Sequence, residues 1–258
     1  MTILFLICLI LFLACWGSFL NFLAYRLVHD ISFAKARSIC PKCHYQIAWF
    51  DLIPIISWLN LQGICRNCQK TISKLYPIIE FLTILIGVAL FYLCNPEDWI
   101  AYFIFISALL VVIRTDLQTM LISRFTTLFL IPVPIILSLV RFNNYPLLPI
   151  TITQSINGIF WGYSILFLIN KITWLIAKKD GLGQGDIDLL AMIGAFSGIY
   201  GVWLSLMIGS ILGSIIGITL IYSGKSKLQT KLPFGPFLAI GAIVYILFQN
   251  QLLTLLFT

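Results

Sequence analysis

Charged residues are scarce in this chain. Only 10% of its 258 residues are Asp, Glu, Lys or Arg, whereas 60% are hydrophobic. Soluble domains carry roughly 25% charged residues, so this composition excludes an ordinary soluble globular fold. The apolar runs are also too long and too numerous for buried core helices. We therefore expect an all-α polytopic membrane protein, because helices satisfy their own backbone hydrogen bonds in lipid.

A basic segment ahead of the first apolar run is lacking as well. We therefore expect residues 1–25 to be a transmembrane helix and not a cleaved signal peptide, since the run is long enough to span. The hydropathy pattern predicts about eight transmembrane helices, with limits good to about three residues. The sixth is short for a full crossing. These spans lie near residues 3–25, 77–94, 99–113, 125–140, 150–177, 187–199, 202–222 and 235–257.

The formal net charge of +7 is distributed unevenly. Lys and Arg crowd into alternate gaps between the spans, and the other gaps hold almost none. The positive-inside rule places the basic gaps in the cytoplasm and both termini outside. Because these basic residues flank membrane spans, we expect a lipid bilayer as a partner and no nucleic acid. The basic gaps cover residues 30–76, 114–124, 178–179 and 225–231.

The first gap is the only sizeable segment expected outside the membrane, and it contains two Cys-x-x-Cys pairs. Cys40, Cys43, Cys65 and Cys68 have the spacing of a four-thiolate zinc site, in which each pair supplies two sulfurs from one tight turn. A segment with so little core needs a metal to fold. Redox-active thiols and cysteines without a metal are the alternatives, although a cytoplasmic location argues against stable disulfides.

The chain thus divides into three parts. Residues 1–28 form the first transmembrane helix, residues 29–76 form a small cytoplasmic tetra-cysteine module, and residues 77–258 form a transmembrane bundle. No internal repeat and no low-complexity tract is recognisable. Pro132 and Pro134 fall inside the fourth span, so we expect them to kink it.

Acidic residues are few, nine in all, and three of them are candidates for function. Glu80 lies inside the second span, where an ionisable side chain is costly and therefore suggests a function. An interfacial Glu paired with a nearby Lys or Arg is the alternative. Asp116 follows the third span and Asp186 begins the sixth, and both lie at cytoplasmic gaps.

Two carboxylates at the same membrane surface can form an aspartic dyad. They cannot both ionise cheaply, so one keeps a proton and acts as an acid while the other activates water. This chemistry needs neither a metal nor a covalent intermediate. A solvated glycine-rich loop is the alternative interpretation of the segment around Asp186.

The glycines of residues 181–185 favour the catalytic interpretation of Asp186. They permit a sharp turn before a helix and place Asp186 at its N-terminus, near the positive end of the dipole. The same turn offers backbone N–H groups as candidate donors to an oxyanion. Asp188 points elsewhere on a helix, so we interpret it either as a residue that supports the catalytic pair without reacting or as a polar-face residue. We expect Asp180 to be solvated beside the lysines at 178–179.

These residues resemble those of a known family. G-x-G-D at 183–186, after an aspartate at the cytoplasmic end of an earlier span, is similar to the GxGD aspartic peptidases of membranes. Within that group the chain resembles the type IV prepilin peptidases over nearly its whole length. The matching segments are GSFLNFLAYRL at 17–27, the module and second-span entrance at 37–83, GLGQGDIDLLAMIGA at 181–195 and LPFGPFLAIG at 232–241.

The resemblance implies a bacterial inner-membrane enzyme that cuts the short basic leader from type IV prepilins and type II secretion pseudopilins on the cytoplasmic side. Members with the cysteine module also N-methylate the new N-terminus with S-adenosylmethionine, although this sequence has no Gly-rich dinucleotide fingerprint. Asp116 and Asp186 match the catalytic pair, and the four cysteines match ligands of metal type. Gly63, Glu80 and Asp51 are linked to the methylation half, with a structural role for both acids equally open.

The sequence departs from the family pattern at two places. Relatives often carry Pro-Asp or Pro-Asn where this chain has Ser123 and Arg124, and often carry Lys where it has Asp188. A carboxylate in place of an amine removes a stabilising charge near the catalytic pair, and we expect it to raise the apparent pKa of the pair.

Two other classes of function fit parts of the pattern. A membrane thiol–disulfide oxidoreductase would use the paired cysteines, but it would place them outside, whereas the basic residues place them inside. A transporter would use intramembrane acids as a proton relay, but Asp116 and Asp186 fall at span ends and not near the midplane.

Overall fold

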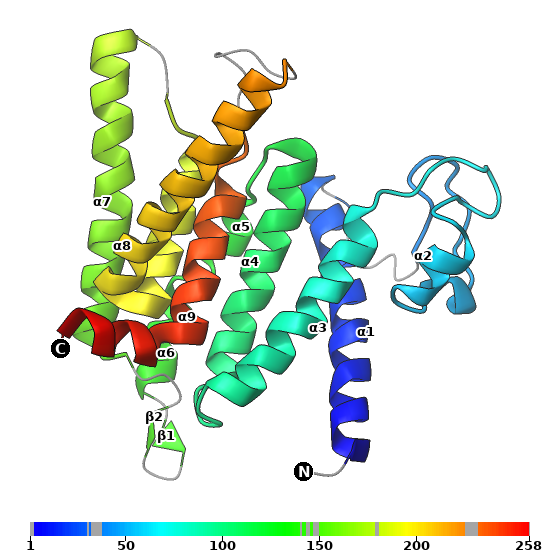
Figure 1. The fold of residues 1–258 in the computed structure, drawn as a ribbon, viewed down its shortest axis with the longest axis horizontal. Coiled ribbons are helices and arrows are strands. Elements are labelled where there is room, and N and C mark those ends of the chain that lie inside the picture. Colours follow the sequence, from blue (N-terminus) through cyan, green and yellow to red (C-terminus); the bar gives the residue numbers. More distant parts are fainter. Residues whose placement is uncertain are drawn as a thin grey trace. The chain divides into compact units, whose positions relative to one another are not determined.

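The structure is a computed structural model, and the chain in it forms two compact units, Met1–Tyr92 and Leu93–Thr258 (Figure 1). The described residues are 3–29, 31, 38–139, 141–142, 145–146, 150–178, 181–224 and 232–257. The expectation for Asp180 lies outside them. So do the positions of the basic residues Lys35, Arg37, Lys179, Lys225, Lys227 and Lys231.

The first unit contains two long apolar helices, and the cysteine module connects them in sequence. These helices are α1 (Ile3–Val28) and α3 (Leu75–Leu93), and the module holds the short 3-10 helix η1 (Trp49–Leu52) and α2 (Ile56–Asn60). Glycine allows α1 and α3 to approach closely, because a Cβ added at Gly17 would lie only 2.8 Å from the Cα atom of Glu80. The close approach holds the two chain ends of the module together.

The second unit is a helical bundle. Its helices are α4 (Trp99–Thr119), α5 (Arg124–Leu128), α6 (Pro132–Leu139), α7 (Ile152–Ala177), α8 (Gln184–Tyr222) and α9 (Gly235–Phe257). A two-residue antiparallel hairpin of β1 (Arg141–Phe142) and β2 (Tyr145–Pro146) pairs Phe142 with Tyr145. This hairpin is a small exception to the predicted all-α fold.

The expected count of eight spans is only partly supported. Within the described residues, five helices are long and apolar enough to cross a membrane: α1, α3, α4, α7 and α8. Two shorter apolar stretches, Arg124–Leu139 and Gly235–Gln249, account for the predicted fourth and last spans. The former is broken between α5 and α6 just before Pro132, where proline was expected to disturb the helix.

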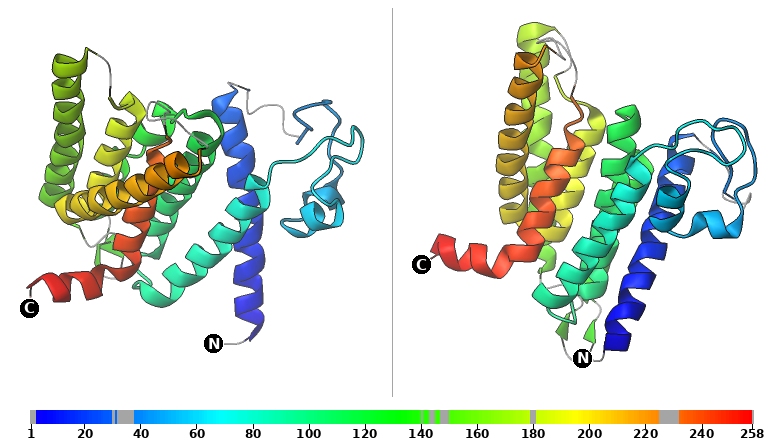
Figure 2. Two further views of the ribbon diagram at one scale, coloured as in Figure 1. Left: turned by 45° about the horizontal axis from the view of Figure 1, so that its top comes forward. Right: turned by 45° about the vertical axis from the view of Figure 1, so that its right-hand side comes forward.

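The predicted sixth and seventh spans form one long element with a break. Gly198 interrupts α8 with φ 63° and ψ −167°, a conformation that L side chains rarely adopt. Figure 2 shows the yellow and orange parts of α8 running in different directions on either side of this break. The two segments therefore act as separate helices, as the hydropathy pattern predicts.

Small residues bring α7 and α8 into close contact. A Cβ added at Gly158 would overlap the backbone of Gly194, and one added at Gly162 would lie 2.5 Å from the carbonyl oxygen of Leu190. Both helices carry a Gly-x-x-x-Gly spacing here, Gly158–Gly162 and Gly194–Gly198, which lets helix backbones pack in lipid through van der Waals contact. This contact fixes the first half of α8, which carries Asp186.

Helix α4 extends further than the sequence indicated. Its predicted end was residue 113, but the helix continues to Thr119 and includes the polar residues Arg114, Thr115 and Asp116, all of them buried. The prediction was wrong here because polar side chains lower the hydropathy and so indicate the end of an apolar span, whereas in the fold neighbouring helices enclose them. Asp116 thus lies on the last turn of α4 and not after it.

Candidate functional site

The four cysteines of the module form one cluster, as the sequence predicts. The Sγ atoms of Cys40, Cys43, Cys65 and Cys68 all lie within 4.8 Å of one another. Cys40 and Cys65 are buried, and the other two are half-buried. One set of four sulfur donors for a metal ion is therefore in place.

Both Cys-x-x-Cys turns have the same backbone. The N–H of Cys40 donates to the carbonyl of Tyr45, and the N–H of His44 donates to the carbonyl of Cys40, each at 2.9 Å. Cys65 and Gln69 repeat these bonds at the equivalent positions. His44 and Gln69 both have φ 56°, so each turn closes through a left-handed residue. The sequence did not reveal this local repeat, because the two turns have little but their cysteines in common.

The thiols of the cluster differ in acidity. The backbone N–H of Tyr45 lowers the pKa of Cys43 to about 7, and that of Cys68 lowers the pKa of Cys65. The N–H of Lys70 acts in the same direction on Cys68, but burial and the three neighbouring thiols raise the pKa of Cys68 to about 11. Four thiolates this close repel one another, so the donor set fits a bound soft cation that offsets their charge.

Asp51 is engaged inside the module. Its Oδ2 accepts a hydrogen bond from Nε of Arg66 at 2.9 Å, and its Oδ1 accepts one from Nη2 at 2.8 Å. The Arg66 guanidinium holds the pKa of Asp51 below its ordinary value. Because Arg66 stands between Cys65 and Cys68, this bidentate pair fastens η1 to the second turn. Asp51 therefore links two parts of the module.

Gly63 is required by the backbone. It has φ 68°, and an added Cβ would lie 2.7 Å from Cζ2 of Trp58. Its N–H donates to the carbonyl of Trp58 at 2.9 Å, and its carbonyl accepts from the N–H of Ile72 at 2.7 Å. This glycine shapes the turn that leads from α2 into the second cysteine pair.

Glu80 connects α3 to the module. Its side chain is 6% exposed, and its Oε2 accepts the backbone N–H of Ile55 at 2.7 Å. Ile55 has φ 63° and ψ −52°, which is strained for a β-branched residue. The interfacial ion pair expected as one alternative is not found among the described residues. Glu80 instead holds a strained loop in place.

Asp116 accepts a hydrogen bond from a residue that lies far along the sequence, at the start of α9. It is 4% exposed, and its Oδ2 accepts the backbone N–H of Gly235 at 3.1 Å. A Cβ at Gly235 would lie 2.8 Å from the same oxygen. Met120 ends α4 with φ 53°, and its N–H donates to the carbonyl of Asp116. The first residue of α9 thus fixes the carboxylate on the last turn of α4.

Asp186 lies on the first turn of α8, with Gly183 as the N-cap, where the sequence places it. The loop ahead of it is held by α7, because Oδ1 of Asn170 accepts the N–H groups of Gly181 at 3.0 Å and Leu182 at 3.1 Å. These two N–H groups are therefore not free to bind an oxyanion, which corrects part of that expectation. Asp186 itself is half-buried, unlike a residue of a solvated loop.

The structure brings Asp116 and Asp186 together. Ile122 contacts both Gly185, which directly precedes Asp186, and Gly235, which donates its N–H to Asp116. A Cβ added at Gly185 would lie 2.8 Å from Cβ of Ile122, and a Cβ added at Gly235 would lie 2.9 Å from Cδ1 of Ile122. The shared contact with Ile122 therefore brings the two aspartates to one place. Two partly desolvated carboxylates in one place can share a proton and activate water between them.

The two departures from the family pattern lie against each other. Nε of Arg124 is 3.0 Å from Oδ2 of Asp188, and Nε2 of Gln184 donates to Oδ1 of Asp188 at 3.1 Å. Asp188 is 2% exposed, so it does not lie on a solvated polar face, and its interpretation as a supporting residue stays a prediction. The guanidinium also supplies the positive charge that the sequence alone suggested was missing.

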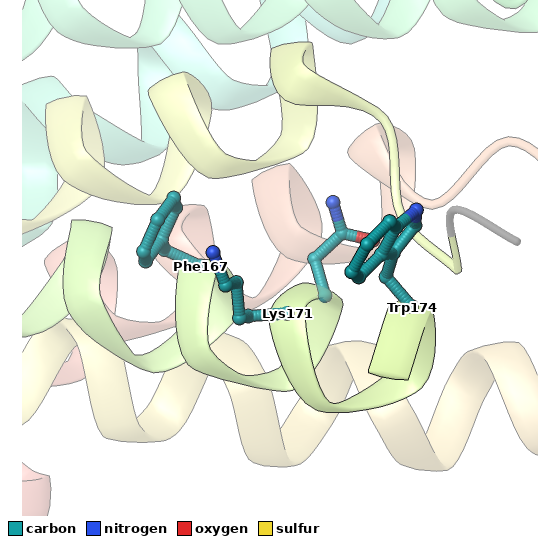
Figure 3. Close-up of a pocket in the computed structure, with 4 residues that line it drawn as sticks. Phe167, Lys171 and Trp174 are labelled. Carbon is teal, nitrogen blue, oxygen red and sulfur yellow. The ribbon is translucent and has the colours of Figure 1, made fainter. Parts of the chain in front are cut away.

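A surface pocket of about 270 Å³ lies beside the glycine-rich loop. Figure 3 shows Phe167, Lys171 and Trp174 along one face of α7, where Asn170 completes the lining. Lys178 lies over the Trp174 ring at 4.9 Å. The pocket contains neither dyad residue, so its relation to the site is through Asn170, which holds the loop.

Comparison with known proteins now decides the family. Residues 11–94 match the model of the bacterial peptidase A24 N-terminal domain, and residues 103–218 match that of the type IV leader peptidase family. The prepilin leader peptidase/N-methyltransferase of Aeromonas salmonicida is 33% identical over 84% of this chain and 72% of its own length. The chain belongs to the type IV leader peptidase family.

Other curated leader peptidases agree with this assignment. A prepilin leader peptidase/N-methyltransferase of Pseudomonas aeruginosa is 28% identical over 96% of this chain and 92% of its own. The type 4 prepilin-like proteins leader peptide-processing enzyme of Escherichia coli is 33% identical over 85% and 78%. No solved structure matches. Membership in a leader peptidase family makes the chain an enzyme and does not favour the oxidoreductase alternative.

Three residues that sequence reasoning missed contact Asp116, the loop before Asp186, or Asp188. Gly235 lies in the segment 232–241, whose resemblance to the family was noted without a role. Asn170 is an isolated polar residue in an apolar span, which is a usable signal. Arg124 was noted only as a departure. Their partners lie far along the chain, so no local pattern reveals the contacts.

Proposed function

We propose that this enzyme cleaves the short basic leader peptide of type IV prepilins and type II secretion pseudopilins. The observation that carries the proposal is the convergence of Asp116 and Asp186 from α4 and α8. The names of the relatives supply the substrate class, since curated homologues are called prepilin leader peptidases.

The chemistry follows from the two carboxylates. Asp116 and Asp186 share one proton, and the ionised member takes a proton from a water molecule as its oxygen adds to the scissile carbonyl carbon. The protonated member gives its proton to the carbonyl oxygen. When the C–N bond breaks, a proton returns to the nitrogen and the new N-terminal amine leaves. Gly235 holds one carboxylate by its N–H, and the loop anchored by Asn170 presents the other.

The substrate approaches from the inner membrane. Its apolar N-terminal helix lies in the bilayer beside the bundle, and its basic leader extends into the cytoplasm. The basic residues that flank the spans support a dyad on the cytoplasmic side and termini outside, by the positive-inside rule. Cleavage at this face separates a soluble basic leader from a membrane-held pilin helix.

The test is incubation of the purified enzyme with a prepilin. Asp116→Asn and Asp186→Asn remove the carboxylates without changing side-chain size, and each is expected to abolish cleavage. Asp98→Asn is the matched control, because Asp98 is also buried, at 4% exposure, but stands just before the opposite end of α4. Unimpaired cleavage by either dyad variant overturns the aspartic mechanism.

The same enzyme is proposed to N-methylate the new N-terminus with S-adenosylmethionine. The support is the second half of the relatives' names. The residues linked to this activity do not show a fit to the methyl donor, because Asp51, Gly63 and Glu80 are engaged by contacts inside the first unit. No step is therefore derived through the donor. The mass of the cleaved product, with and without S-adenosylmethionine, tests the activity, and an unchanged mass refutes it.

A structural zinc ion is proposed for the cysteine cluster. Cys40, Cys43, Cys65 and Cys68 would hold it, and it would supply folding free energy to a module with little core. Metal analysis is expected to find tightly bound zinc that Cys65→Ser removes and Cys15→Ser, at an exposed cysteine of α1, retains. A reducible disulfide in place of a metal would refute the zinc site and restore the oxidoreductase alternative.

A further inference from the structure

The buried carboxylate of Asp188 has no part in the proposed reaction, yet it is fully partnered. It lies on the first part of α8, two residues after Asp186, and is 2% exposed. Its two oxygens accept from Arg124 at 3.0 Å and from Gln184 at 3.1 Å. A buried charge is costly unless it is paired and hydrogen-bonded, so these partners are needed for α8 to begin in this way.

The two hydrogen-bond donors to Asp188 come from two different helices. Gln184 is the first residue of α8, on the same turn as Asp186. Arg124 is the first residue of α5, with its side chain 63% exposed. The pair therefore ties the start of α8 to the start of α5, and α5 follows closely on the end of α4.

The connection from α4 to α5 also carries the other carboxylate. Asp116 is on the last turn of α4, and Ile122, two residues before Arg124, lies against Gly185. The α4–α5 connection thus touches α8 immediately before Asp186, through Ile122, and two residues after it, through Arg124. Both contacts bear on the position of one carboxylate relative to the other.

We propose that the ion pair of Arg124 and Asp188 is a positioning pair that sets the orientation of Asp186 toward Asp116. Neither residue touches the reacting atoms, and the inference rests on the proposed peptidase function. Only Asp188 of this pair is buried, whereas the Arg124 side chain is 63% exposed, so the pair is a weak source of stability; fixing one arrangement is the better-attested use of such pairs. An aspartic dyad depends on such a fixed arrangement, because small displacements of reacting groups cost much of the rate.

The experiment compares cleavage of a prepilin by single and reversed variants. Arg124→Gln and Asp188→Asn each break the pair, and we expect each to lower kcat by about 10- to 100-fold, as a displacement of about 1 Å does, with KM nearly unchanged. The double variant Arg124→Asp with Asp188→Arg restores a pair of opposite polarity and is expected to recover most of the lost kcat. Lys74→Gln, at an exposed cation of the first unit, is the control and should retain full activity.

Several results would overturn the proposal. Single variants with wild-type kcat would do so, as would a reversed double variant no better than the singles. A change confined to KM would assign the pair to substrate binding instead. If Asp188→Asn does not fold, Arg124→Gln decides, because its side chain is largely exposed. Failure of the wild type itself to cleave refutes the peptidase function and this inference with it, whereas an active wild type with equally active singles refutes only the inference.

Discussion

Substitution of Gly235 by alanine probes the dyad without touching a carboxylate. The new Cβ would lie 2.8 Å from Oδ2 of Asp116 and 2.9 Å from Cδ1 of Ile122. Real Cβ atoms do not approach other atoms this closely, so the carboxylate has to move away. It then loses part of the hydrogen bond from the Gly235 N–H, now 3.1 Å long.

The magnitude follows from that bond. A hydrogen bond to a charged group contributes about 1.5–3 kcal/mol, and each 1.36 kcal/mol changes a rate by about tenfold. Gly235→Ala is therefore expected to lower kcat about 10- to 150-fold in a prepilin cleavage assay, with protein yield and thermal unfolding little changed.

The matched control lies in the neighbouring helix. Gly213 of α8 contacts Phe237 of α9, but a Cβ there would lie at an ordinary 3.4 Å from Cδ2 of that ring. Gly213→Ala should cleave like the wild type. Equal activity of the two alanine variants would show that the Gly235 contact does not position Asp116, and the reasoning would then be refuted.

Three further predictions concern the supports of the two units. Asn170→Leu leaves two loop N–H groups without an acceptor, which costs about 1–3 kcal/mol each, and should reduce cleavage at least tenfold. Asn170→Asp keeps an acceptor and should cleave far better than Asn170→Leu. Equal losses in the two variants would contradict the proposal that Asn170 anchors the loop. Gly158→Leu overpacks the α7–α8 contact by about 1–3 kcal/mol and should lower the thermal unfolding temperature in detergent; no shift would argue against that packing. Arg66 lowers the pKa of Asp51, so the pair stabilises the fold above the unfolded pKa of about 3.9, and this stability is lost as pH falls through the lower folded pKa. Asp51→Asn should abolish that part of the pH dependence of unfolding. A variant with the same pH profile as the wild type would refute this contribution.

The long apolar helices could be predicted because their signal is local. Helices α1, α3 and α7 follow the hydrophobic runs closely, and the Cys-x-x-Cys spacing indicates the cluster. The end of α4 could not be predicted, because Arg114 and Asp116 are polar in sequence but enclosed in the fold. Burial of a polar residue depends on partners that hydropathy does not include.

The candidate site divides in the same way. Its two aspartates were identified from glycine spacing and membrane topology, whereas their supports depend on contacts across the bundle. The bond from Gly235 to Asp116 joins residues in different helices far apart in the chain. Asp188 shows why one position cannot be interpreted alone. Relatives often carry a Lys amine there, and in this chain Arg124, a second departure from the family pattern, supplies the positive charge instead.

The break at Gly198 has a consequence for where the reaction occurs in the membrane. The segment of α8 from Gln184 to this break has roughly 14 residues and is about 21 Å long. The hydrocarbon core of a bilayer is about 30 Å thick. The bilayer therefore thins beside this half-helix, or one end of the half-helix lies below the headgroups. If Asp116 and Asp186 cleave pilins as proposed, bilayers of longer acyl chains should therefore change the access of the scissile bond to them.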